Sequence, residues 1–308
     1  MRVLGIEKYR LSGRLKAKAL TLSSFLIFFF GCFESEIQQN AASEPTLYKV
    51  SNGAWIGATA TATNSFTTNG GFFASSTGDS LFSFPQSPAV DVIRGSLYVA
   101  DPANNEIVKL NLATGTFVGA LGYVSSNFGN CPSSGVPATW CFGGLFKGFM
   151  GDGAFSSPGG IVLDLQRSFF YVSDSKNYRV AKYNLLTGAF VGAIGALNGS
   201  TGTCPSSGVS NTWCTGGRFA TSSVDGGLAD QSSIALDITH GYIYVVDTAN
   251  NRAQIFALAS GAFVGAIGAV AGTTGTCPSS GVTPGWCTGG SFIAGSADGA
   301  LNTPGGIA

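Results

Sequence analysis

Short apolar runs separated by polar turns recur along the chain, and residues 158–194 show this pattern most clearly. Apolar runs occupy residues 160–164, 169–173, 179–184 and 190–194. Each run has the usual length of a β-strand, and the breaks contain Ser, Asn, Asp and Gly, which favour tight turns. The pattern therefore predicts a small antiparallel meander of four strands.

The same unit recurs with a fixed step of 73 residues, which Asp101, Asp174 and Asp247 illustrate. The step is also kept by Thr114, Thr187 and Ser260, by Cys131, Cys204 and Cys277, by Trp140, Trp213 and Trp286, and by Cys141, Cys214 and Cys287. A fixed period of this kind defines a repeat architecture. One small meander exposes too much apolar surface to be stable alone, so the copies are expected to pack on one another. Radial packing predicts an all-β protein of the β-propeller class, with one blade per copy.

Several motifs within the unit are also similar to those of a known family. Residues 152–164 read DGAFSSPGGIVLD, residues 171–174 read YVSD, and residues 177–180 read NYRV. These resemble the opening and the centre of the NHL repeat, and residues 98–107 and 244–252 match its centre as well. The resemblance implies three near-complete NHL-like blades of four strands each. It implies no particular activity, because this fold carries adhesion modules, RNA binders and a few lyases.

Each copy is longer than an NHL-like blade, for which the usual period is roughly 40–50 residues. The additional residues lie between the fourth strand of one copy and the first strand of the next. They are predicted to form inter-blade loops on one face of the propeller, together with the turn between strands two and three. Residues 48–57 and 303–308 resemble parts of further blades. We therefore expect a propeller over residues 47–308, with partial blades at both ends and an incomplete C-terminus.

The N-terminal segment has the pattern of an export signal. Residues 1–31 contain six basic residues and one acidic residue, and an apolar run occupies residues 19–30. Such a run is too short for a mature membrane span. Gly31 before Cys32 resembles the signal of bacterial lipoproteins, although Phe29 stands where Leu is usual. The resemblance implies a signal peptide over 1–31, a lipidated Cys32 and a flexible tether over 32–46. An ordinary secretory signal and an uncleaved anchor are the alternatives.

The net charge is no longer zero when the predicted signal peptide is left out. The whole chain is formally neutral, but the part from Cys32 onward has ten basic and fifteen acidic residues, a net charge of −5. An acidic domain without a basic stripe argues against nucleic-acid binding. We therefore expect a protein of the bacterial cell envelope, in the outer membrane or at the periplasm or cell surface. Its only membrane contact would be the lipid anchor.

The cysteine pattern agrees with export to an oxidising compartment. The seven cysteines comprise Cys32 and three pairs, each with nine residues between its members. The pairs predict local disulfides, namely Cys131 with Cys141, Cys204 with Cys214, and Cys277 with Cys287. Reduced thiols and a metal site are the alternatives. A metal site is disfavoured because each loop has two thiols and no His, whereas structural zinc needs four ligands.

Catalytic chemistry finds little support in the sequence. The chain has one His, His240, and it lacks a phosphate-binding loop and a nucleophile elbow. One carboxylate per copy at Asp79, Asp152, Asp225 and Asp298 falls short of a calcium site, so a turn role is predicted there. Asp101, Asp174 and Asp247 are likewise expected to fix turns. The sequence therefore predicts no catalytic residues, no metal and no cofactor.

A binding face is the more favoured interpretation. It would combine the loop tryptophans with polar residues near the turn between strands two and three, namely Trp140, Trp213, Trp286, Asn104, Asn177, Asn250, Arg179 and Arg252. Exposed aromatics dominate many binding surfaces, so the expected partner is a protein or a glycan. For the indoles themselves, packing over the disulfides is the favoured interpretation, and an exposed binding surface is the alternative. The alternative functions are a structural envelope protein, and a metal-dependent lyase or hydrolase with key residues in a missing C-terminal part.

Overall fold

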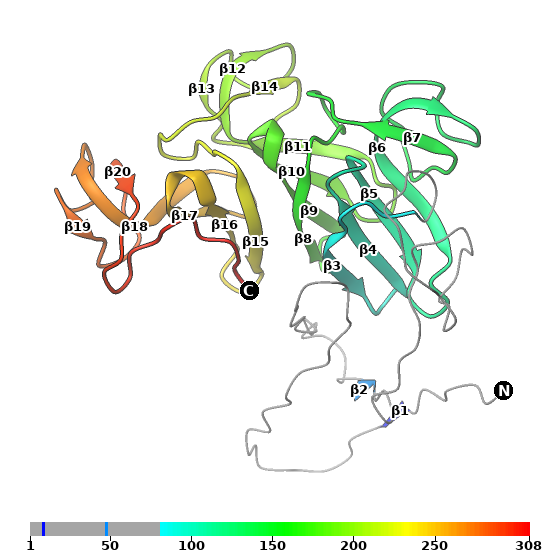
Figure 1. The fold of residues 1–308 in the computed structure, drawn as a ribbon, viewed down its shortest axis with the longest axis horizontal. Helices are drawn as coiled ribbons and strands as arrows, with labels where there is room; N and C mark the ends of the chain where they lie inside the picture. The colour runs from blue at the N-terminus through cyan, green and yellow to red at the C-terminus, as the bar shows by residue number, and fades with distance from the viewer. Residues whose placement is uncertain (1–7, 10–46, 49–80) are drawn as a thin grey trace.

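The computed structural model describes residues 8–9, 47–48 and 81–308 and shows an all-β protein (Figure 1). Strands β1 (Lys8–Tyr9) and β2 (Leu47–Tyr48) pair antiparallel. Apart from Lys8–Tyr9 and Tyr48, the predicted signal peptide, the lipidation site Cys32, the tether and the partial copy over residues 48–57 lie outside the described residues. No helix in the described part of the chain is long and apolar enough to span a bilayer.

Three antiparallel meanders of four strands follow one another along the chain. The first sheet contains β3 (Gln86–Asp91), β4 (Ser96–Asp101), β5 (Glu106–Asn111) and β6 (Phe117–Asn127). The second contains β8 (Pro158–Asp164), β9 (Phe169–Asp174), β10 (Arg179–Asn184) and β11 (Phe190–Ile194). The third contains β15 (Gln231–Asp237), β16 (Tyr242–Asp247), β17 (Arg252–Ala257) and β18 (Phe263–Thr273). The predicted four-strand unit is confirmed.

The turn between the second and third strands has the same backbone shape in all three sheets. In the later two it contains the short 3-10 helices η2 (Ser175–Asn177) and η3 (Thr248–Asn250). The residue that closes each turn is left-handed, with φ of 57° at Asn105, 53° at Tyr178 and 53° at Asn251. Asn tolerates this conformation better than most residues, which accounts for two of the three positions.

The long connections predicted as loops contain strands of their own, and we call them excursions. They cover residues 123–147, 196–220 and 269–293. Their strands are β7 (Gly144–Lys147), β12 (Ala196–Ser200), β13 (Gly208–Val209), β14 (Gly217–Phe219), β19 (Gly281–Val282) and β20 (Gly290–Ile293). In the first and third copies the fourth strand continues from the sheet into the excursion, where it pairs with these short strands.

A glycine marks the point where the fourth strand leaves each sheet. Gly195 separates β11 from β12 at φ 152°, and a Cβ there would lie 2.7 Å from the carbonyl oxygen of Tyr178. Gly122 and Gly268 occupy the same position, with φ of 154° and 151°. Only a residue without a side chain fits so close to the turn between strands two and three. Each excursion therefore begins beside that turn of its own sheet, as the sequence predicts.

Each excursion also covers the outer edge of its sheet. The second cysteine of every pair forms an antiparallel bridge to the fourth strand, as Ala120 with Cys141, Ala193 with Cys214, and Ala266 with Cys287. Two backbone hydrogen bonds hold each bridge, for example Ala193 N–H to the Cys214 carbonyl at 2.9 Å. The backbone groups that an edge strand would otherwise expose are thereby paired in part.

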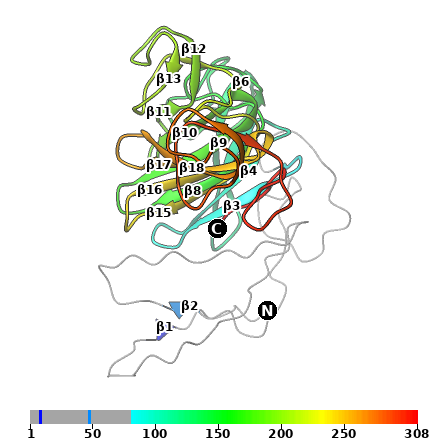
Figure 2. The same cartoon turned by 90° about the vertical axis from the view of Figure 1, so that its left-hand side faces the viewer.

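The sheets contact one another through their first strands, since β8 lies against both β3 and β15. Figure 1 shows these strands near one another and the excursions on the outer side. The view turned by 90° shows the strands of the three sheets overlapping in depth (Figure 2). Apolar side chains fill the space between neighbouring sheets in two clusters, one between the first and second sheets and one between the second and third. The copies therefore bury their apolar faces against each other, as predicted.

Candidate binding surface

The three predicted disulfides are present in the excursions. They join Cys131 to Cys141, Cys204 to Cys214, and Cys277 to Cys287, and all six cysteines are buried. Each bond closes a sequence separation of ten residues, a loop for which the chain-entropy estimate gives about 2–3 kcal/mol of stabilisation. The predicted pairing is confirmed, and the alternatives of reduced thiols and a metal site are not what the structure shows.

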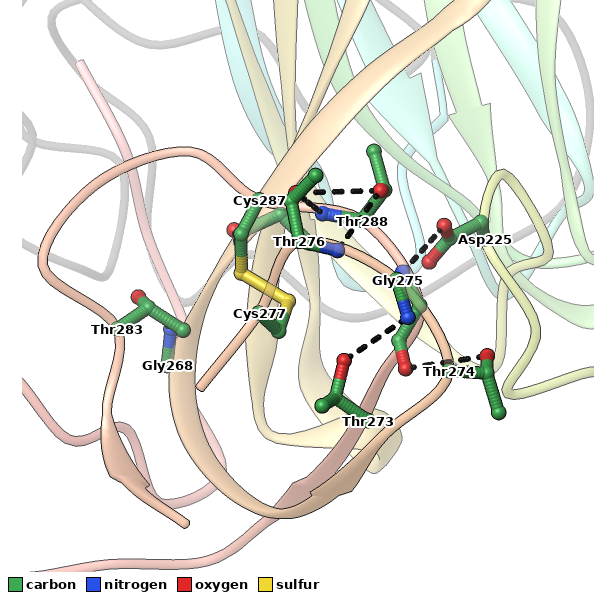
Figure 3. The surroundings of a disulfide bond; sticks show 12 residues. Asp225, Gly268, Thr273, Thr274, Gly275, Thr276, Cys277, Thr283, Cys287 and Thr288 are labelled. Atoms are coloured by element: carbon green, nitrogen blue, oxygen red, sulfur yellow. Dashed lines mark hydrogen bonds between the residues drawn. A yellow bond between two sulfur atoms is a disulfide. The ribbon is translucent and has the colours of Figure 1, made fainter. Parts of the chain in front are cut away.

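Hydrogen bonds fix the third excursion around its disulfide (Figure 3). The hydroxyls of Thr276 and Thr288 lie 3.2 Å apart, and the Thr288 N–H donates to the Thr276 hydroxyl at 2.9 Å. The Asp225 carboxylate accepts a 2.7 Å hydrogen bond from the Gly289 N–H, and Asp152 makes the equivalent 2.8 Å bond to Gly216 in the second copy. These two aspartates connect each excursion to the opening of its own copy, 64 residues earlier in the chain, a long-range contact that the predicted turn role did not include.

A phenylalanine, and not the neighbouring tryptophan, packs with each disulfide. Phe146 lies in the cluster of the first disulfide, Phe219 in that of the second and Phe292 in that of the third. Trp140 and Trp213 belong instead to the clusters between sheets. The prediction that the indoles pack over the disulfides is therefore wrong. The sequence places Trp directly before Cys, but adjacent side chains along an extended chain point in opposite directions.

The tryptophans also do not form one exposed aromatic face. Trp140 lies against Tyr98 of the first sheet and Phe170 of the second, with ring centroids 5.5 and 5.9 Å away. Trp213 lies 5.3 Å from Tyr171, and its indole N–H donates to a backbone carbonyl of the third sheet at 3.1 Å. Trp286 alone of the three is exposed, at 42%. The predicted binding face is wrong for Trp140 and Trp213, because these indoles fill the space between sheets.

The polar residues assigned to that face lie in the interior. Arg179 and Arg252 are 1% and 0% exposed, and each donates from Nε to an aspartate, Asp174 or Asp247, at 2.9 Å. Their remaining N–H groups donate to backbone carbonyls, such as that of Ala154 at 2.7 Å. Both side chains are buried and bonded within the fold, so their assignment to a binding face is wrong.

The three asparagines have the same structural role. Asn104, Asn177 and Asn250 donate to the aspartate of their own turn at 3.0, 2.8 and 2.8 Å. They also donate to backbone carbonyls of the segment that precedes the sheet, with distances of 3.2, 3.0 and 2.8 Å. Asn104 and Asn177 are buried, and Asn250 is half-buried. Their amides therefore fix the turn, and the binding-face prediction fails for them as well.

The aspartates of these turns are fully buried, which changes their acidity. Burial raises the pKa of Asp101 to about 6, although hydrogen bonds from Ser83 and Asn104 oppose the shift. Burial also raises the pKa of Asp174, and there the Arg179 guanidinium is the largest opposing influence. The predicted turn role is confirmed by the bonds from the asparagine of the same turn, three residues later. The Ser83, Ser156 and Ala229 N–H groups also donate to the three carboxylates, at 2.7, 2.7 and 2.8 Å, and connect each turn to the segment 18 residues before it.

Three exposed phenylalanines lie on or beside the first excursion, where the sequence analysis did not place them, whereas the exposed Phe84 and Trp286 lie elsewhere. Phe128 is 83% exposed and Phe142 is 48% exposed, and they stand on either side of the Cys131–Cys141 loop. Phe149 and Met150, at 43% and 50%, follow at the base of the excursion, where Phe149 stacks on Tyr123 with ring centroids 4.1 Å apart. Within residues 81–308, no group of three or more His, Cys, Asp or Glu could hold a metal ion.

The other two excursions carry small polar residues at these positions. Phe128 corresponds to Thr201 and Thr274, and Phe142 corresponds to Thr215 and Thr288. In the later copies the second of these threonines bonds to a neighbouring threonine across the loop, for example Thr203 to Thr215 at 3.2 Å. The exchange of Thr for Phe at a fixed repeat position was the sequence signal for this surface.

Comparison with known proteins adds no assignment: a scan against models of protein families found no match, and a search among curated proteins found no similar sequence. The resemblance of the repeated unit to the NHL repeat therefore stays a prediction from its motifs.

Proposed function

We propose that this protein is a non-catalytic, exported β-propeller of NHL-like blades that binds a protein or a glycan through its disulfide-bearing excursions. In this proposal the three sheets are blades arranged around an axis. Their packing through β3, β8 and β15, with apolar clusters between neighbouring sheets, supports it. A lipid on Cys32 would tether the protein to the bacterial cell envelope, and the three disulfides are compatible with an oxidising environment there.

The exposed aromatic tip of the first excursion carries this proposal. Phe128 and Phe142 lose little conformational freedom on binding, because a disulfide, backbone pairing and close contact with Gly129 already hold their loop. Residues 117–146 contain no charged side chain, so a partner would desolvate no ionic group there. Aromatic side chains with these properties are typical of the central residues of binding surfaces.

A photo-crosslinking experiment tests this function. A benzophenone amino acid replaces Phe128 in the exported protein, and the same amino acid replaces Thr201 as the matched control on the second excursion. Illumination of cells and of glycan arrays incubated with the purified protein should give adducts from position 128 and none from position 201. The paired substitutions Phe128→Thr and Phe142→Thr should abolish the captured interaction without unfolding the protein, since threonine is native to these positions in the other copies. Equal labelling from both positions would contradict the proposal.

A structural role without a ligand is the second candidate, and the second and third excursions favour it. Their threonine pairs and their bridges to the fourth strand stabilise the sheet edges and present no aromatic tip. For this role, the absence of adducts at both positions is the expected result. Catalysis is not proposed, because no constellation of acid, base and nucleophile occurs among the buried polar groups described above.

A further inference from the structure

An arginine of the repeat is replaced by a glutamate in the first copy. Arg179 and Arg252 stand directly across the strand pair from the buried aspartate of their turn. Glu106 has this position in the first copy, across from Asp101, and the two residues are 4% and 0% exposed. Residues opposite one another in an antiparallel pair project from the same face of the sheet. The first copy therefore places two buried carboxyl groups where the later copies have an ion pair.

A backbone carbonyl adds a third oxygen group at this place. The Arg179 guanidinium donates from Nη2 to the Ala154 carbonyl at 2.7 Å, and the third copy repeats this bond at the same distance. Leu81 is the residue of the first copy that corresponds to Ala154. Its carbonyl accepts a 3.2 Å hydrogen bond from the side chain of Asn104, which also donates to Asp101 at 3.0 Å. The carbonyl is thus kept beside the aspartate, although the guanidinium that binds it in the later copies is not.

One oxygen of the Asp101 carboxylate is left without a donor. In the second copy both oxygens of Asp174 accept hydrogen bonds, and the second oxygen accepts from Arg179 at 2.9 Å. Asp101 accepts from the Ser83 N–H and from Asn104 on Oδ2 alone. Its Oδ1 is buried and accepts no hydrogen bond from the described residues. A buried acceptor without a donor is costly in free energy, so this oxygen indicates a ligand that carries positive charge.

No basic residue in the preceding sequence replaces the missing arginine. Residues 50–93 contain no Lys, Arg or His. Arg94 pairs with Asp91 at 3.0 Å, at the opposite end of β4 from Asp101. In the later copies one negative and one positive charge cancel, whereas the carboxylates of Asp101 and Glu106 together carry two negative charges. Buried charges in proteins are paired or coordinate a metal ion, and a divalent cation balances this pair.

We propose that Asp101, Glu106 and the Leu81 carbonyl bind a divalent cation, calcium, at the position that the guanidinium has in the later copies. Every donor is an oxygen and one is an uncharged carbonyl, a mixture that calcium binds in irregular geometry with water as the remaining ligands. Magnesium requires a nearly regular octahedron and is therefore disfavoured. The site differs from the sequence prediction of no metal, because it adds to the aspartate of the turn a carboxylate found in one copy only. It is independent of the binding proposed for the aromatic tip.

Calcium titration tests this site. The purified, oxidised protein is freed of metal with a chelator at neutral pH and titrated with calcium chloride in a calorimeter. We expect about one ion per chain with a Kd of about 0.1–1 mM, the range of extracellular calcium modules. At about 10 mM calcium, the midpoint of thermal unfolding should rise by about 5 °C. Saturating calcium should also suppress the pH response of Asp101 that the calcium-free protein shows, because a carboxylate that binds a cation stays ionised.

Glu106→Arg is the decisive variant, because it supplies the guanidinium that is native to this position in the later copies. It should not bind calcium, and its unfolding midpoint should not respond to the ion. Glu106→Gln removes one charge with little change of shape and should weaken binding about tenfold or more, whether or not the arginine variant folds. Asp230→Asn is the control, because it removes an exposed carboxylate and should bind calcium as the unchanged protein does.

Two results would overturn the proposal. The first is the absence of both calorimetric binding and a shift of the midpoint in the unchanged protein, which would mean that protonation alone neutralises the two carboxyl groups. The second is an equal calcium response of Glu106→Gln and the unchanged protein, which would place the ion elsewhere. Magnesium binding as tight as that of calcium would overturn the choice of ion. None of these results bears on crosslinking at Phe128.

Discussion

The first sheet and the two later sheets hold the same turn with different charges. In the second and third sheets the buried aspartate faces an arginine across the strand pair, Asp174 with Arg179 and Asp247 with Arg252. In the first sheet the partner of Asp101 in the strand register is Glu106, which is also buried. All three carboxylates nevertheless accept a backbone N–H from the segment before the sheet, at 2.7 to 2.8 Å.

The comparison shows that the groups that shape the turn differ from the group that balances the charge of its aspartate. The backbone donor and the asparagine amide are present in every copy, so they are sufficient to shape the turn. The guanidinium adds a counter-charge in two copies and links the turn to carbonyls of the preceding segment, such as Gly151. We therefore expect the first sheet to respond to pH through Asp101, and the later sheets to depend on their arginines.

Removal of an arginine should have the largest effect on stability. Arg179→Met leaves Asp174 buried without its counter-charge, for which we expect a loss of about 3–5 kcal/mol in the free energy of unfolding. Denaturant titration of the oxidised protein measures this loss. Arg167→Met is the matched control, because its 3.0 Å pair with Asp164 is half-exposed and contributes about 1 kcal/mol or less. Equal losses of stability in the two variants would contradict the prediction that the buried ion pair contributes more than the exposed one.

Removal of a disulfide should affect the first and second copies alike, although only the first excursion is aromatic. The double substitutions Cys131→Ser with Cys141→Ser, and Cys204→Ser with Cys214→Ser, open loops of equal length. Each should lower the free energy of unfolding by about 2–3 kcal/mol in the chain-entropy estimate. Denaturant titrations of both variants measure the difference. A much larger loss in the first copy would mean that its phenylalanines also stabilise the fold.

The pH dependence of the first sheet should be smaller still. The folded pKa of Asp101, about 6, lies above the usual value of 3.8 for an aspartate, so its contribution to stability is complete below about pH 4 and is lost as pH rises through 6. Asp101→Asn removes this titration. Relative to the variant, the unchanged protein should lose about 2 kcal/mol between pH 4 and 7. Parallel stability curves for the two proteins would contradict the assignment.

The smallest effect concerns the residue that closes the turn. Tyr178 is left-handed at φ 53°, where the other copies have Asn105 and Asn251. Tyr178→Asn removes this strain and supplies an amide oxygen that can accept a backbone N–H, as Asn105 accepts that of Ser157. We expect a gain of about 1 kcal/mol in the free energy of unfolding. Thermal unfolding should show a higher midpoint, and the reverse change Asn105→Tyr should lower it.

Local features of the fold could be predicted from the sequence, and long-range contacts could not. The strands β10 and β11 and the three disulfides followed from turn residues and cysteine spacing within one copy. The interior position of Arg179 did not, because it depends on carbonyls of a segment 25 to 28 residues away.

The candidate site was predicted only in its location. The excursions stay the proposed binding region, but the side chains that the sequence analysis assigned to the surface were those shared by the copies, and this sharing reflects packing. Trp140 and Trp213 occur at the same repeat position because a large apolar side chain fills the space between neighbouring sheets at each interface. Phe128 and Phe142 differ from the threonines at the equivalent positions because the packing of the fold does not require them. Positions at which one copy differs from the others are therefore the better indicators of a binding surface in a repeat protein.

The bridge between each second cysteine and the fourth strand has a consequence for solubility. Fibril growth requires an edge whose amides and carbonyls can template an incoming chain, and the residues around Ala120, Ala193 and Ala266 offer that template only partly. A covalent bond holds the covering segment in place, so transient fraying does not release it. Reducing conditions would therefore make this protein aggregate at concentrations where the oxidised form stays dispersed.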